Sequence, residues 1–152
     1  MHSYGIRTTG AGKDLAEARE PAIVERNGIR IGFLGWSAVT PPGAEAGATK
    51  TGIATLRIRW CLEPRGPHAP ARIITEPDER DLAMICDDVA ALRKRVDAVI
   101  VAFHWGVMWA PRIVSDYQVA AAHACIDAGA DLIIGHHAHI PKGVEVYKIG
   151  RA

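Results

Sequence analysis

Ala98-Val99-Ile100-Val101-Ala102-Phe103 is the stretch that decides the fold. It is apolar on both faces, as a strand in the middle of a covered parallel sheet is. A helix is predicted for residues 115–128, with Gly129 as its C-terminal stop, and Asp131-Leu132-Ile133-Ile134 follows as a second strand. Two strands joined by one helical crossover lie parallel, with a right-handed connection. The sequence therefore predicts an α/β fold.

Shorter elements are predicted on both sides of this unit. Two apolar runs flank Asn27-Gly28, which predicts a β-hairpin with a type I′ turn. Apolar residues spaced by three and four predict a helix over residues 78–95. Residues 37–77, rich in glycine, proline and alanine, are predicted as long loops around one strand at 53–60. A short helix from Asp14 and a short strand over Gly143–Tyr147 complete the prediction.

The composition excludes several classes of protein. The chain has 152 residues, 49% of them hydrophobic and 23% charged, with a net charge of +1. Such a balance gives no electrostatic footprint for nucleic acid, so no nucleic-acid partner is expected. No apolar run approaches the length of a transmembrane segment, and no signal peptide is recognised at the start. The three cysteines form no CxxC pair, and we interpret them as apolar filler.

Histidines follow both predicted buried strands. His104 comes directly after the first strand, and Gly135-His136-His137-Ala138-His139 follows the second. The carboxyl ends of parallel strands meet at one edge of a sheet, where open α/β sheets bind ligands. On extended backbone His137 and His139 would project to the same side, with His136 pointing away. Neutral imidazoles bind borderline divalent metals such as zinc, manganese and iron, so this edge is a candidate metal or anion site.

A structural alternative stays open for these histidines. A single histidine after a strand is more often a hydrogen-bonded structural residue than a ligand, and a cluster can satisfy its own hydrogen bonds. Trp105, Gly106 and Gly135 adjoin the histidines and are the candidate lining of a substrate pocket. Packing is the alternative role for the tryptophan.

At these residues the chain resembles a known family. The motifs are His104-Trp105-Gly106, Asp116-Tyr117-Gln118, Ile126 to Asp131, and the cluster Gly135 to His139. They resemble the CapA (capsule and poly-γ-glutamate biosynthesis) family of the calcineurin-like metallophosphoesterase superfamily, with Ala138 where that family has proline. The resemblance covers most of residues 8–147 and is strongest over 98–147.

The resemblance implies a β-sandwich flanked by helices that carries a divalent transition metal site, with two ions in a complete domain. It implies that His104, His137 and His139 are metal ligands. His136 would then be the catalytic residue that supports the site or donates a hydrogen bond to the transition state. The implied substrate is an anionic phosphoester, and the family implies association with the cell envelope.

Part of the family pattern is absent from this sequence. It contains no Asp-x-His and no Asn-His, and its only asparagine is Asn27. Asp97 and Asp131 precede their strands and are expected at the opposite edge, so no carboxylate would bridge two ions. Residues 1–152 are therefore expected to be a partial CapA-like domain, incomplete at both ends, with half of the site. The alternative is a catalytically silent module that binds one metal or a partner chain, with association through an exposed edge.

Overall fold

A four-stranded sheet forms the centre of the molecule. The computed structural model describes residues 5–148. The sheet has the order β2-β3-β7-β8, formed by β2 (Ala22–Arg26), β3 (Ile29–Ser37), β7 (Ala98–His104) and β8 (Leu132–His136). β3, β7 and β8 are parallel, and β2 runs antiparallel to β3. The predicted α/β fold and both predicted strands are confirmed. The prediction that both strands are buried holds for β7 and is wrong for β8, because β8 lies at the edge of the described sheet and most of its residues are exposed.

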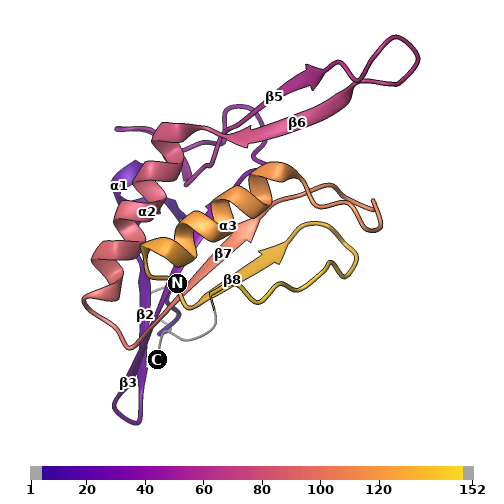
Figure 1. The fold of residues 1–152 in the computed structure, drawn as a ribbon. Coiled ribbons are helices and arrows are strands. Elements are labelled where there is room, and N and C mark those ends of the chain that lie inside the picture. The colour runs from indigo at the N-terminus through magenta and orange to yellow at the C-terminus, as the bar shows by residue number, and fades with distance from the viewer. Residues whose placement is uncertain (1–4, 149–152) are drawn as a thin grey trace.

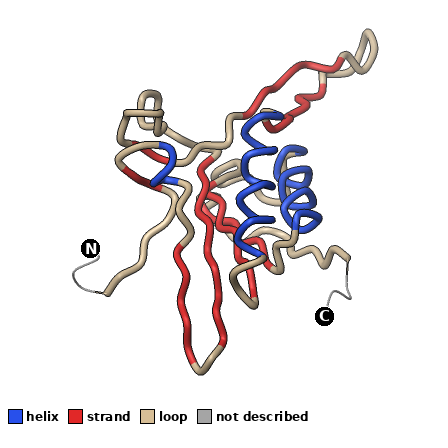
Figure 2. The backbone as a smooth tube through the Cα atoms, turned by 90° about the vertical axis from the view of Figure 1, so that its left-hand side faces the viewer, coloured by secondary structure: helices blue, strands red, loops and turns tan. Residues whose placement is uncertain are grey.

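Two helices cover one face of this sheet. α2 (Glu79–Arg93) and α3 (Asp116–Ala128) lie side by side on that face (Figures 1 and 2). The apolar stripe of α2 buries Ile85, Val89 and Leu92, and Leu92 packs where Gly32 leaves room for its side chain. α3 begins with the capping box of Ser115 and ends at Gly129, whose φ of 117° is left-handed. Both helices lie where the sequence predicts them.

The remaining elements are short. α1 (Leu15–Ala18) begins at the N-cap Asp14, whose side chain accepts a hydrogen bond from the backbone N–H of Glu17, 2.8 Å. β1 (Ala11–Gly12) pairs with β4 (Gly52–Ile53), and β5 (Ile58–Glu63) pairs with β6 (Arg72–Pro77) in a hairpin that projects from the body (Figure 1). Within residues 5–148 these are two-stranded sheets beside the central one. The second layer of the predicted sandwich stays a prediction.

Two local predictions are corrected. The region predicted as loops around one strand at 53–60 contains three strands. β4 pairs with β1, about 40 residues earlier in the chain, whereas β5 and β6 pair with each other as a local hairpin. Gly143–Tyr147 is not a strand. Tyr147 instead stacks on His123 of α3 with ring centroids 3.7 Å apart, and Glu145 lies 3.0 Å from His123 Nε2. Side-chain contacts with α3 hold this segment, and no strand among residues 5–148 pairs with it.

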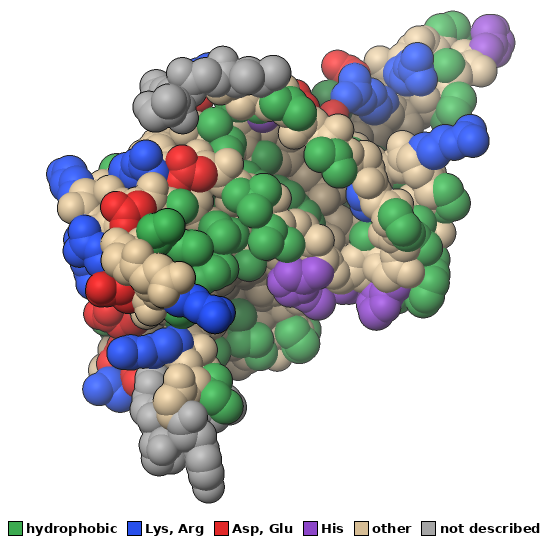
Figure 3. Space-filling model, turned by 90° about the horizontal axis from the view of Figure 1, so that it is seen from below, with side chains coloured by type: hydrophobic (Ala, Val, Ile, Leu, Met, Phe, Trp, Pro, Cys, Tyr) green, Lys and Arg blue, Asp and Glu red, His purple; other side chains and the backbone are tan. Residues whose placement is uncertain are grey.

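The face of the sheet opposite the helices is apolar and partly uncovered. Pairing places Phe33, Ile100 and Leu132 in one row on this face. About half of the side-chain surface is exposed at Val24, Ile29, Leu132 and Ile134. Seen from below, a broad hydrophobic area lies next to histidine side chains (Figure 3). β8 is also an edge strand among the described residues, as expected for a surface that supports association.

Candidate metal-binding edge

The register of the parallel strands brings the two histidine motifs together. His104 ends β7 and His136 ends β8, and these two residues are direct partners in the ladder. Their side chains therefore lie on the same face, and their Nδ1 atoms are 3.0 Å apart. The predicted meeting of motifs about 30 residues apart is confirmed. The prediction that His136 points away is wrong, because strand pairing with β7 sets its direction.

His137 and His139 leave the strand in a turn. Their φ angles are 90° and 59°, so the backbone is left-handed at both residues, and the extended conformation predicted here is not found. His137 nevertheless reaches the first pair, with its ring centroid 4.5 Å from that of His104. His139 follows at 5.7 Å from His137. Four imidazoles thus lie along one edge of the sheet.

His104 favours the neutral state. Partial burial, with the nearby rings of His137, His136 and His139, lowers the pKa of His104 below its ordinary value. Of the His104–His136 pair, one Nδ1 donates its proton and the other accepts it. The donating ring then keeps a bare Nε2, which is the form of imidazole that binds a metal ion.

The predicted pocket residues Trp105, Gly106 and Gly135 pack and hydrogen-bond next to the histidine cluster. Trp105 is buried, stacks on Phe103 with centroids 4.4 Å apart, and donates its backbone N–H to the carbonyl of His136, 3.0 Å. Gly135 leaves room for the indole nitrogen of Trp105, where a methyl group would collide. Gly106 has a φ of 92° and donates its N–H to the hydroxyl of Tyr117, 2.7 Å. Their role in a substrate pocket stays a prediction.

Two residues outside the predicted site lie beside the cluster. Trp109 is 62% exposed and stacks on His139 with ring centroids 5.2 Å apart, while its backbone N–H donates to the carbonyl of Ala138, 3.1 Å. The ammonium of Lys142 donates to the carbonyls of Ala110 and Ile113. Together they fasten the loop after β7 to the chain after β8. Only the fold brings these segments together.

Carboxylates are placed at the other edge, as predicted. Asp97 accepts a hydrogen bond from the backbone N–H of Arg30, 2.7 Å, and Asp131 accepts one from Val99, 2.8 Å. Both therefore fasten the amino ends of the strands. In residues 5–148, no three histidine, cysteine, aspartate or glutamate side chains converge to hold a metal ion. The four histidines therefore lie close together without forming a complete metal site, and Asp97 and Asp131 add no carboxylate at this edge.

Comparison with known proteins identifies a family. The family model described as bacterial capsule synthesis protein PGA_cap matches residues 1–151. A probable polyglutamine synthesis accessory protein of Mycobacterium tuberculosis is 34% identical over 151 residues, which are 95% of this chain and 34% of that protein. The PGA biosynthesis protein CapA of Bacillus subtilis is 30% identical over 139 residues, covering 91% of this chain and 30% of its own length.

A third relative gives a similar coverage. The capsule biosynthesis protein CapA of Bacillus anthracis is 30% identical over 141 residues, 93% of this chain and 29% of the relative. The chain thus spans about a third of the length of the curated relatives it matches. Within residues 5–148, no helix is both long and apolar enough to cross a membrane.

Proposed function

This chain belongs to the bacterial capsule synthesis protein PGA_cap family, and on that premise we propose that it takes part in capsule or poly-γ-glutamate biosynthesis at the cell envelope. Its histidine edge would be the imidazole part of a metal-dependent phosphoester site. The supporting observation is the convergence of His104 with three further histidines at the carboxyl edge of parallel strands.

His104, His137 and His139 are the residues that would hold a manganese, zinc or iron ion. A divalent ion bound there would supply positive charge to a phosphoryl oxygen. His136, paired with His104, would orient that ring and donate a hydrogen bond to the anionic substrate. Carboxylate ligands for such a site would have to come from residues outside 5–148 or from another chain.

Metal titration tests this proposal. We expect Mn²⁺ or Zn²⁺ to bind the purified chain, as measured by calorimetry, and binding to be lost in the double variant His137→Ala, His139→Ala. His68→Ala is the matched control, because His68 lies in the turn of the β5–β6 hairpin, outside the cluster. Equal metal affinity in the double variant and in His68→Ala would contradict the ligand assignment.

Hydrolysis of bis-p-nitrophenyl phosphate tests the half-site. We expect no turnover above the rate of the free metal ion, since Asp97 and Asp131 lie at the opposite edge and no three potential ligands converge to hold a metal ion in residues 5–148. Turnover by this chain that His104→Ala abolishes would show that the site is sufficient as it stands.

A second candidate function is a silent module that binds a partner chain. The uncovered apolar face with exposed Ile134 and Leu132 favours it, because surfaces of this kind are commonly covered in assemblies. Light scattering over a range of protein concentrations would measure association. We expect Ile134→Glu to lower it, whereas an unchanged mass distribution would argue against this face as the contact.

A further inference from the structure

The loop between β7 and α3 carries a run of exposed apolar side chains. Residues 107–114 read Val-Met-Trp-Ala-Pro-Arg-Ile-Val, so Arg112 is the only charged residue among them. Contiguous exposed apolar surface of this kind commonly marks a binding site, because loops at the surface are normally polar. The large apolar side chains of this loop are between 43% and 62% exposed: Val107, Met108, Trp109, Ile113 and Val114.

This loop is fastened to the chain that carries the later histidines. The Trp109 ring stacks on His139 with ring centroids 5.2 Å apart, and the backbone N–H of Trp109 donates to the carbonyl of Ala138, 3.1 Å. The ammonium of Lys142 donates to the carbonyl of Ile113, 3.1 Å. Figure 1 shows the loop after β7 and the chain after β8 extending in the same direction. The exposed apolar surface therefore begins at the histidine cluster.

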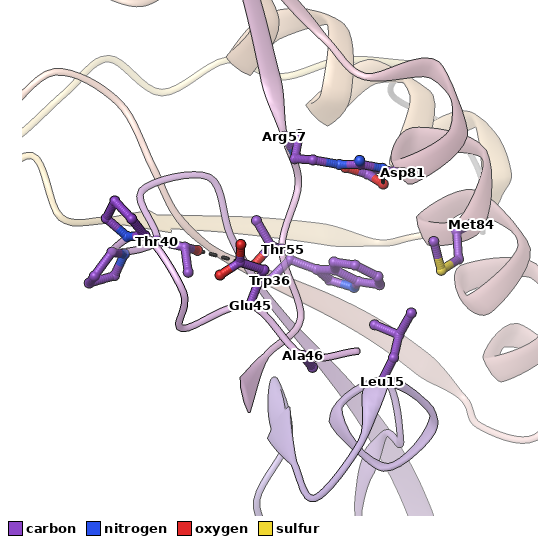
Figure 4. Close-up of a pocket in the computed structure, with 11 residues that line it drawn as sticks. Leu15, Trp36, Thr40, Glu45, Ala46, Thr55, Arg57, Asp81 and Met84 are labelled. Atoms are coloured by element: carbon purple, nitrogen blue, oxygen red, sulfur yellow. Dashed lines mark hydrogen bonds and ion pairs between the residues drawn. The ribbon is translucent and has the colours of Figure 1, made fainter. Parts of the chain in front are cut away.

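Arg112 adds an unpaired cation to this surface. It is exposed, and it lies in the sequence between Trp109 and Ile113, where the loop is fastened. Its guanidinium has no hydrogen bond or ion pair within residues 5–148. The situation differs at the cavity on the helix side of the sheet, where Arg57 already binds the carboxylate of Asp81 (Figure 4). Arg112 is thus available for an anion, and guanidinium binds phosphate through paired hydrogen bonds.

The combination of charge and apolar surface restricts the ligand. A wholly apolar partner would cover Arg112 without pairing its charge, which is costly. A small hydrophilic phosphate would pair with Arg112 and leave the apolar side chains in water. An anion that carries an apolar chain satisfies both parts. The uncovered sheet face, with its row of Phe33, Ile100 and Leu132, has no such cation within the row.

We propose that the loop 107–114 binds an anionic amphiphile, with the phosphate on Arg112 and the hydrocarbon chain along Val107, Met108 and Trp109. Because Trp109 also stacks on His139, a phosphate bound there lies next to the histidine edge. The substrate class of that edge is then a phosphoester with a long hydrocarbon chain. This assignment of the substrate rests on the proposed function, whereas binding of the amphiphile depends on the loop alone.

Calorimetric titration with ethyl phosphate and octyl phosphate tests the proposal. Both ligands are used as monomers, below the concentration at which octyl phosphate forms micelles, with and without Mn²⁺. We expect octyl phosphate to bind at least about tenfold more tightly, since each methylene group that leaves water adds up to about fourfold in affinity. Its dissociation constant without metal should be on the order of millimolar or below. Mn²⁺ should tighten both phosphates and leave the ratio of their affinities unchanged.

Variants of the loop separate the chain from the charge. Trp109→Ala should lower the ratio of the two affinities by about threefold or more. Met108→Ser should lower it too, and it leaves the stack of Trp109 on His139 in place. Arg112→Gln should weaken both phosphates by about tenfold and keep the ratio. The matched controls are Trp60→Ala and Arg65→Gln, which change an exposed tryptophan and an exposed arginine of the region 58–77 and should bind like the wild type.

A ligand of opposite charge and a membrane surface complete the test. Octylammonium has the same chain, and it should bind at least about tenfold more weakly than octyl phosphate, because Arg112 repels it. Equal affinity for ethyl and octyl phosphate, equal binding of octylammonium, or an unchanged ratio in Trp109→Ala would each overturn the proposal. Sedimentation with phosphatidylglycerol vesicles, without saturable binding of octyl phosphate, would make the loop a membrane contact and overturn it as well.

The same titrations distinguish this proposal from the proposed function. Binding of Mn²⁺ together with equal affinity for both phosphates would refute the amphiphile site and leave the metal site standing. Octyl phosphate that binds more tightly than ethyl phosphate to a chain without affinity for Mn²⁺ would support the loop as an amphiphile site. That second result would contradict the metal-dependent function.

Discussion

Asp81 is the buried carboxylate that joins α2 to the loop before β5. Its side chain is 5% exposed and accepts three hydrogen bonds from Arg57, from the backbone N at 2.9 Å, Nε at 2.8 Å and Nη2 at 2.6 Å. This carboxylate also raises the pKa of the Arg57 guanidinium, because it hydrogen-bonds to the charged form. We expect Asp81→Ala to be among the more destabilising single substitutions in the chain.

The size of the effect follows from which partner loses its bond. The backbone N–H of Arg57 would be left without its acceptor, which costs about 1–3 kcal/mol for a buried group. The guanidinium is 67% exposed and 3.7 Å from Asp78, so water and Asp78 would replace most of its lost interaction, and a surface value below about 1 kcal/mol applies. The free energy of unfolding should therefore fall by about 1–4 kcal/mol. The melting temperature should fall by roughly 3–12 °C, at about 3 °C per kcal/mol in a domain of this size.

Urea unfolding followed by circular dichroism measures this difference. The control is Asp87→Ala, the same substitution at an exposed position of the same helix, which should stay within about 0.5 kcal/mol of wild type. A double-mutant cycle with Arg57→Ala would separate the pair from the loss of the carboxylate alone. If Asp81→Ala were no less stable than Asp87→Ala, the hydrogen-bonded pair would not hold α2 to this loop.

Two further predictions concern Asp116 at the start of α3 and Gly135, which packs against Trp105 next to the histidine cluster. Hydrogen bonds from the backbone N–H of Thr75 and from Arg72 lower the pKa of Asp116 in the folded protein. The ionised carboxylate therefore stabilises the fold at pH values above its pKa in the unfolded chain, which is about 3.9. This stabilisation is lost as the pH falls through the lower pKa of the folded protein. The stability advantage of wild type over Asp116→Asn, measured by urea unfolding, should thus be constant near neutral pH and shrink below pH about 4. Gly135→Ala should place a methyl group against the indole of Trp105 and lower the free energy of unfolding by about 1–3 kcal/mol.

Each of these predictions has its own check. For Asp116, a stability difference that does not change between neutral and acidic pH would show that its ionised carboxylate does not stabilise the folded protein. For Gly135, the control is Gly143→Ala, since a methyl group there meets no atom within 4 Å. Equal melting temperatures for the two alanine variants would mean that Trp105 moves aside without cost.

Much of the central fold is predictable because its signals are local. The run Ala98–Phe103 is apolar on both faces, and the turn Asn27-Gly28 adopts the positive φ angles, 53° and 79°, that a type I′ turn requires. Asp78 caps α2 through hydrogen bonds to the backbone N–H groups of Arg80 and Asp81. Such features depend on residues within one turn or one strand, so the sequence shows them directly.

The candidate site is predictable in its location and not in its geometry. Parallel strands imply that His104 and the later histidines share an edge, whatever else the chain does. Which histidine faces His104 depends on the register between β7 and β8, and a shift of one residue would exchange His136 for its neighbour. Hydrophobic pattern alone does not set that register at the end of a strand. The left-handed turn at His137 is likewise absent from the pattern of residue types.

By itself, then, the sequence determined the α/β class, the helix and strand positions of the central unit, and the edge where chemistry is expected. The tertiary structure decided that His136 pairs with His104 and that Trp36 is buried with no hydrogen-bond partner for its Nε1–H among residues 5–148. The physical reason is the range of the interactions. Periodicity and caps act between neighbours in the chain, whereas register, burial and cavities depend on contacts between residues far apart in the sequence.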